Sequence, residues 1–199
     1  MSQPERRRPR PILAADVERL ARDAGHGDPY ARLELAHATA AVVVEAGRAE
    51  HGRPTEQFIR LVDEVGLDTL SELWRDAAAD SLPGALWAIY LLQTWCGRQG
   101  ESVARAYRAG RAYAPVDEVV AGVADEVDPE AVQRLADAIL AGAYEGDFDV
   151  ALERAAAFFR VVATGREQLG EDTELAARNI DTALALQRAA AGWRAGTLR

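Results

Sequence analysis

The residue types that most often carry acid–base, nucleophilic or metal chemistry are scarce in this sequence. The three histidines, His26, His37 and His51, all lie within the first 51 residues, and there is no lysine among the 23 basic residues. Histidine, lysine and cysteine perform most acid–base and nucleophilic catalysis. The composition therefore leans against an enzyme, although arginine, aspartate, glutamate and tyrosine side chains leave an unidentified reaction open.

One pair of residues has a spacing that is used to bind metal. Glu34 and His37 form a Glu-x-x-His motif, which di-iron helix bundles use twice together with two further glutamates on facing helices. The only other candidate, Asp23-x-x-His26, runs into a turn that contains two glycines and would not stay helical. We therefore expect no metal site and no cofactor.

Cys96 is the single cysteine, and it lies beside Trp95 in an uncharged segment. A cysteine nucleophile needs a base or a positive environment that lowers its pKa, and no histidine is near it in the sequence. We expect an inert, buried thiol. One cysteine also allows no disulfide framework, which favours a reducing compartment and a cytoplasmic location.

Residues 81–97 combine aromatic and polar side chains without a single formal charge. In an α-helix, positions i, i+3, i+4, i+7 and i+8 share one face. The residues at those positions are Trp87, Tyr90, Leu91, Thr94 and Trp95. Tyr107 and Arg108 fall on the next predicted helix and could complete an aromatic wall. The candidate ligand-binding residues are therefore Trp87, Tyr90, Thr94, Trp95, Tyr107 and Arg108.

Three interpretations of this face remain open. It can be plain core packing with aromatic bulk, the wall of a pocket for a small apolar ligand, or a homodimer face, because aromatic side chains are enriched in all three. Buried tyrosine hydroxyls and indole nitrogens need hydrogen-bond partners. A few polar contacts should therefore cluster beside the face.

Helix signals dominate the chain and predict an all-α fold. Aspartate–proline pairs such as Asp28-Pro29 and Asp128-Pro129 suit helix starts, and five Glu-to-Arg pairs at i,i+4 mark solvated helix faces. We expect a single bundle-like domain of about nine or ten helices, joined by short loops. The predicted helices span residues 13–24, 29–49, 55–65, 68–80, 82–98, 101–113, 116–125, 129–144, 147–165 and 172–194.

The arrangement of these helices can be outlined only coarsely. Because a helix that is apolar all round is typical of a core, we expect 82–98 to be the central helix. Residues 1–11 form a proline- and arginine-rich tail that we expect to be flexible, and residues 12–199 form the helical domain. Its weakest point, and so a candidate subdomain seam, is Ala114-Pro115.

The charge pattern argues against two classes of partner. The formal net charge is −9, which repels nucleic acid and anionic membrane surfaces. A membrane span needs about 20 apolar residues, and the uncharged segment is shorter and contains Gln93 and Thr94. We therefore expect neither nucleic acid nor a membrane as a partner.

The function suggested by the sequence is correspondingly broad. We expect a non-catalytic interaction or regulatory protein that binds a protein partner or itself. The alternative is a helical bundle that binds a small molecule against the 87–95 face, and the third possibility is an enzyme of unknown reaction.

Overall fold

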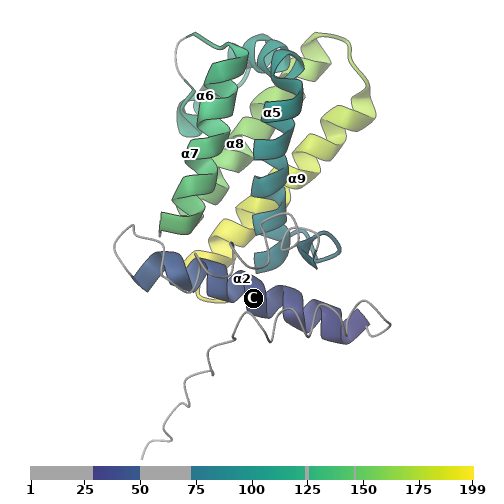
Figure 1. The fold of residues 1–199 in the computed structure, drawn as a ribbon. Coiled ribbons are helices and arrows are strands. Elements are labelled where there is room, and N and C mark those ends of the chain that lie inside the picture. Colours follow the sequence, from purple (N-terminus) through teal and green to yellow (C-terminus); the bar gives the residue numbers. More distant parts are fainter. Residues whose placement is uncertain (1–28, 50–72, 124–125, 146) are drawn as a thin grey trace, which may run out of the picture.

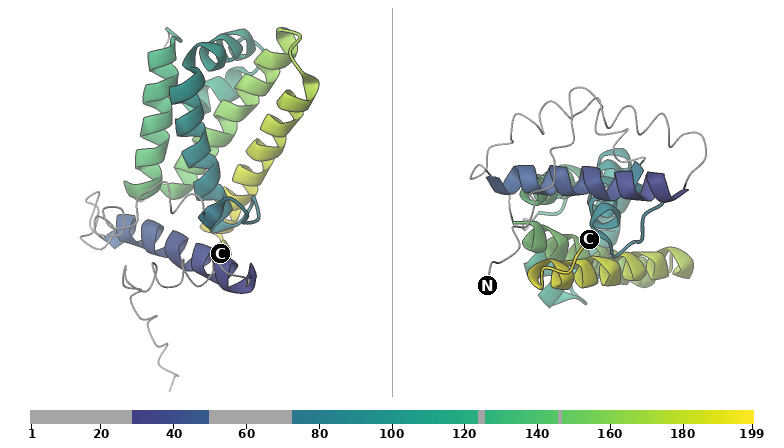
Figure 2. Two further views of the ribbon diagram at one scale, coloured as in Figure 1. Left: turned by 45° about the vertical axis from the view of Figure 1, so that its right-hand side comes forward. Right: turned by 90° about the horizontal axis from the view of Figure 1, so that it is seen from below.

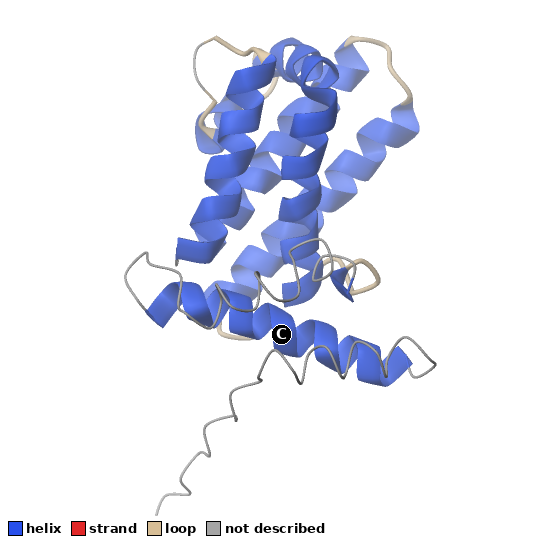
Figure 3. Cartoon of the chain, viewed as in Figure 1, coloured by secondary structure: helices blue, strands red, loops and turns tan. Residues whose placement is uncertain are grey.

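The computed structural model describes residues 29–49, 73–123, 126–145 and 147–199, with the side chains of 45–49 and 145 left aside. These residues contain six helices and no strand, which confirms the predicted all-α class (Figures 1 and 3). The helices are α2 (Pro29–Ala49), α5 (Leu82–Arg111), α6 (Pro115–Ala121), α7 (Pro129–Glu145), α8 (Phe148–Gln168) and α9 (Thr173–Arg194).

The expected count of nine or ten helices does not match the six in the described part of the chain. The predicted helices 82–98 and 101–113 are joined within α5 as two segments that meet at a kink, where Gln99 has non-helical backbone angles (φ −132°, ψ 33°). Residues 75–81 are turn rather than the end of a helix, and α6 stops at Gly122, whose φ of 77° is left-handed. The predicted helices 13–24 and 55–65, like the 1–11 tail, lie outside the described residues.

Helix α5 begins where the sequence provides a cap. The Ser81 hydroxyl oxygen accepts a hydrogen bond from the Gly84 amide at 3.3 Å, and Pro83 lies in the first turn, where its missing N–H leaves no bond unmade. Within α5, Gln99 is the residue with non-helical backbone angles, and it lies at the predicted junction between 82–98 and 101–113.

Helix α8 shares the centre of the bundle with the uncharged 82–98 segment, whose helix α5 packs on all five other described helices. α8 packs on α5, α6, α7 and α9, and most of its length is buried. The burial of α8 is hard to predict from the sequence because Arg160 and Arg166 interrupt the apolar run of this helix. Arg160 lies 2.7 Å from Asp117, which accommodates its charge on a largely buried helix, whereas the carboxylate that faces Arg166, on Glu171, is 3.9 Å away.

Helix α2 crosses one end of the upright helices (Figures 1 and 2), where it contacts α5 and α7. A buried polar contact links it to the rest of the molecule. The Trp74 indole N–H donates to the Thr39 hydroxyl at 3.1 Å, while that hydroxyl donates to the carbonyl oxygens one turn earlier. This satisfies the polar atom of an otherwise buried tryptophan.

Helices α5 and α8 approach each other closely at two glycines. A Cβ added to Gly165 would lie 1.7 Å from the Ala106 carbonyl oxygen, and one added to Gly110 would lie 1.9 Å from the Val161 carbonyl oxygen. The two helix backbones are therefore in contact, and any side chain at either position would force them apart.

We predict that Gly165→Ala lowers the free energy of unfolding by at least about 2 kcal/mol, because the close-packed crossing cannot absorb a methyl group. Urea unfolding followed by circular dichroism measures this. The matched control is Gly142→Ala on α7, whose added Cβ would meet only the Ala151 Cβ at 3.9 Å. That variant should gain up to about 1 kcal/mol from helix propensity. Equal stability of the two variants would contradict the crossing.

Candidate functional site

A pocket of about 700 Å³ opens between α5, α9 and the turn that precedes α5. Its volume lies in the range of small-molecule sites. It is lined mainly by apolar side chains, with charged and polar groups at its edge. The lining residues from α5 are Gly84, Trp87, Ala88, Leu91 and Trp95, and those from elsewhere are Arg75, Ala77, Ala79, Phe159, Asp181, Thr182, Leu184, Ala185 and Arg188.

The predicted aromatic face supplies one wall of this pocket. Trp87, Leu91 and Trp95 are spaced at i, i+4 and i+8, so they form a row along α5, and all three line the pocket. Leu91 is 42% exposed, and Leu184 on α9, which also lines the pocket, is 44% exposed. The face is therefore not fully packed as core in the described structure.

The other two members of the predicted face lie outside the pocket. The Tyr90 ring stacks on the Trp87 ring, with centroids 5.9 Å apart. Burial, followed by the charge of Tyr90, raises the pKa of Tyr144 on α7 to about 12. Thr94 is half-buried and does not line the pocket. The five-residue face thus divides into a row at the pocket and a row that includes Tyr90 nearer α7.

Tyr107 and Arg108 also lie away from the pocket. Neither lines the pocket, because both follow the kink at Gln99 that divides α5 into two segments. Tyr107 is fully buried against Phe158, with ring centroids 5.2 Å apart, and burial raises its pKa above the ordinary range. Arg108 donates to the Val127 carbonyl oxygen at 2.6 Å, a contact that ties α5 to the segment before α7.

Sequence reasoning missed the far wall and the edge of the pocket. Phe159 on α8 stacks on Trp95, with centroids 6.1 Å apart and an interplanar angle of 8°. Arg188 lies at the edge, 3.2 Å from Asp80, in an exposed ion pair. Phe159 belongs to an aromatic pair in a long apolar helix, but nothing in the order of residues along the chain indicates that this ring meets Trp95.

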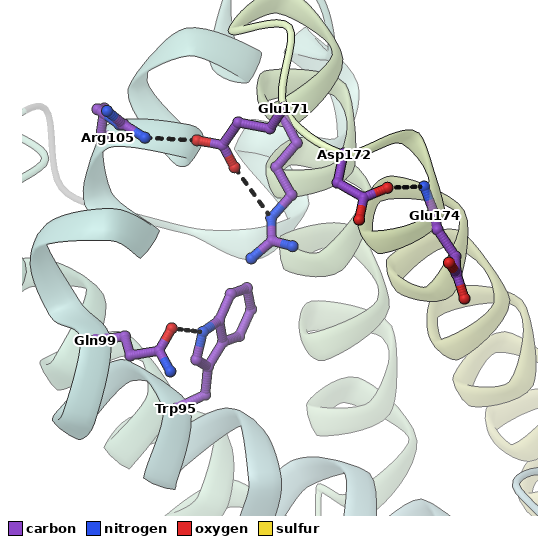
Figure 4. Close-up of polar contacts among 7 residues, drawn as sticks. Trp95, Gln99, Arg105, Glu171, Asp172 and Glu174 are labelled. Atoms are coloured by element: carbon purple, nitrogen blue, oxygen red, sulfur yellow. Dashed lines mark hydrogen bonds and ion pairs between the residues drawn. The ribbon is translucent and has the colours of Figure 1, made fainter.

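A buried arginine lies beside the same tryptophan. The guanidinium carbon of Arg166 is 5.2 Å from the centroid of the Trp95 ring, and the Trp95 indole N–H donates to the Gln99 side-chain oxygen at 3.3 Å (Figure 4). Glu171 lies 3.9 Å from the Arg166 Nε but only 2.6 Å from an Arg105 nitrogen. Polar contacts therefore cluster beside the aromatic wall, around Trp95.

The residues considered for nucleophilic or metal chemistry lie elsewhere. Cys96 is buried, and burial, followed by the negative charge of Asp137, raises the pKa of its thiol to about 12. His37 lines a separate cavity of about 420 Å³ between α2 and the end of the chain. No group of three or more histidine, cysteine, aspartate or glutamate side chains that could hold a metal ion occurs among the described residues.

No helix in the described ranges is both long and apolar enough to cross a membrane. Comparison with known proteins finds no matching family model, no matching curated protein and no matching solved structure. The site must therefore be interpreted from its own geometry.

We predict that Cys96 reacts with Ellman's reagent only after unfolding, because a thiol with a pKa of about 12 forms almost no thiolate at pH 8. The pKa of the Cys96 thiol in the folded protein exceeds its ordinary value of 9.0, so the folded state holds the thiol proton more tightly than the unfolded state does. This contribution to the stability of the folded state is complete below pH 9 and is lost as the pH rises toward 12. The free energy of unfolding should fall between pH 9 and 10, and Cys96→Ala should flatten this fall. Rapid labelling of the folded protein at pH 8 would contradict the burial.

Proposed function

We propose that the protein is a non-catalytic binding protein, and that the pocket between α5 and α9 takes a small, largely apolar molecule that carries a flat ring. The single observation that supports this most strongly is the incompletely buried row of Trp87, Leu91 and Trp95 along a pocket of about 700 Å³. Small-molecule sites are concave and mostly apolar, with a few polar groups that orient the ligand.

The composition of the pocket favours binding over catalysis. Its lining contains one carboxylate, Asp181, and two arginines, Arg75 and Arg188, without a histidine or cysteine among the described residues. Arg188 is engaged with Asp80. Histidine and cysteine carry much of general acid–base and nucleophilic catalysis, and this lining contains neither.

The proposal is tested with N-phenyl-1-naphthylamine, a neutral fluorescent probe that quenches tryptophan emission by energy transfer. Wild-type protein should bind one probe per chain, with saturable quenching. Leu91→Glu should weaken binding at least tenfold, because it places a charge against the apolar wall of the pocket. Leu91 is already 42% exposed, so this substitution should leave the fold intact.

Val150→Glu is the matched control, since Val150 is a similarly exposed apolar residue on α8 that does not line the pocket. It should bind the probe as wild type does. The proposal is wrong if the wild-type protein has no saturable site, or if Leu91→Glu and Val150→Glu bind with equal affinity.

A second candidate function is self-association through α6. Val116 and Val119, at i and i+3 on this helix, are 75% and 79% exposed. The neighbouring carboxylates, Asp117 and Glu118, are engaged by Arg160 and Arg111. Two copies of this surface could therefore meet without repulsion between unpaired like charges, which favours a second copy of the chain as the partner.

We predict that sedimentation velocity shows wild-type protein shifting from monomer to dimer as concentration rises, and that Val119→Glu remains monomeric. The substitution should not affect folding, because Val119 is almost fully exposed. A wild-type protein that stays monomeric up to several hundred micromolar would rule out self-association through this helix.

A further inference from the structure

The buried arginine beside the pocket is poorly compensated. Arg166 is only 8% exposed, yet its Nε–H has no hydrogen-bond acceptor among the described residues. The nearest carboxylate oxygen, on Glu171, is 3.9 Å from that nitrogen, which is too far for a hydrogen bond. A buried donor without an acceptor is costly, and a buried cation more so.

The counter-ion of Arg166 is also shared. Glu171 lies 2.6 Å from the Arg105 nitrogen, so its stronger contact is with that exposed arginine (Figure 4). One carboxylate therefore serves two guanidinium groups, and the longer of its two contacts is the one to Arg166.

Trp95 connects this charge to the pocket. The same indole ring lines the pocket, stacks on Phe159 and lies beneath the Arg166 guanidinium, whose carbon is 5.2 Å from the ring centroid. Arg166 and Phe159 are seven residues apart on α8, so they lie on the same face two turns apart. A flat ligand that lies along the pocket wall with one end at Trp95 would bring that end close to Arg166.

We infer that the pocket binds an aromatic monocarboxylate, with its ring against Trp87 and Leu91 and its carboxylate paired with Arg166. This inference rests on the proposed function. A guanidinium presents a planar pair of donors that matches a carboxylate. Arg166 lies beside Trp95, just outside the pocket lining, and that lining holds Asp181 and an Arg188 already engaged by Asp80. One negative charge, directed at Arg166, therefore fits better than the two of a phosphate monoester.

The test compares two probes of nearly equal shape, 2-naphthoate and the neutral 2-naphthalenemethanol, by tryptophan quenching. Wild-type protein should bind 2-naphthoate at least tenfold more tightly. In Arg166→Gln the affinity for 2-naphthoate should fall to that for 2-naphthalenemethanol, whose own affinity should change less than threefold. Arg178→Gln removes an exposed arginine on α9 that does not line the pocket, and it should leave both affinities unchanged.

Glu171→Gln provides a second variant, which retains Arg166 and so remains informative if Arg166→Gln does not fold. Because Glu171 competes with the ligand for Arg166, its neutralisation should raise the affinity for 2-naphthoate at least threefold and leave that for 2-naphthalenemethanol unchanged. An unchanged 2-naphthoate affinity in this variant would contradict the inference.

The outcomes separate the inference from the function on which it rests. If wild-type protein binds both probes equally, or if Arg166→Gln weakens both to the same extent, the role of Arg166 is wrong and the apolar pocket stands. If neither probe binds, the proposed function is wrong and the carboxylate inference fails with it.

Discussion

At the crossing of α5 and α8, two glycines allow the helix backbones to touch, and the pocket depends on that contact. Gly110 and Gly165 leave no room for a Cβ. Because the two helices are held together at this point, Trp95 can reach both Phe159 and Arg166 from the neighbouring helix. α9 packs along α8, and α5 contacts α9 much less extensively than it contacts α8. The pocket is the space that remains between α5 and α9.

The sequence predicted much of this structure, because helical periodicity is a local property. The all-α class, the whole of α2 and nearly the whole of α7 follow from proline starts and apolar spacing. The row Trp87, Leu91 and Trp95 follows from the same periodicity. The remaining errors have physical causes. The predicted break between 82–98 and 101–113 is a kink at Gln99, and beyond it Tyr107 packs on Phe158 and Arg108 bonds to the Val127 carbonyl oxygen, so neither joins the row.

The sequence alone does not predict the contacts between helices. The uncharged 82–98 segment shares the centre of the bundle with α8, which carries Arg160 paired with Asp117 and the less well paired Arg166. Phe159, Leu184 and Arg188 join the site only because three helices meet there. The spacing of residues along one helix does not predict which other helices pack against it. The candidate site could therefore be anticipated as one wall, but not as a pocket with a buried cation beside it.

The central claim is that a ligand binds against the α5 wall, and the indole N–H signals of the four tryptophans test it most directly. In a two-dimensional ¹H–¹⁵N spectrum titrated with 2-naphthoate, the signals of Trp87 and Trp95 should shift and saturate together. Those of Trp74, which is buried against α2, and Trp193, which lines the separate cavity, should stay in place. Saturable shifts confined to Trp193, or no shift at Trp87 and Trp95, would contradict the account.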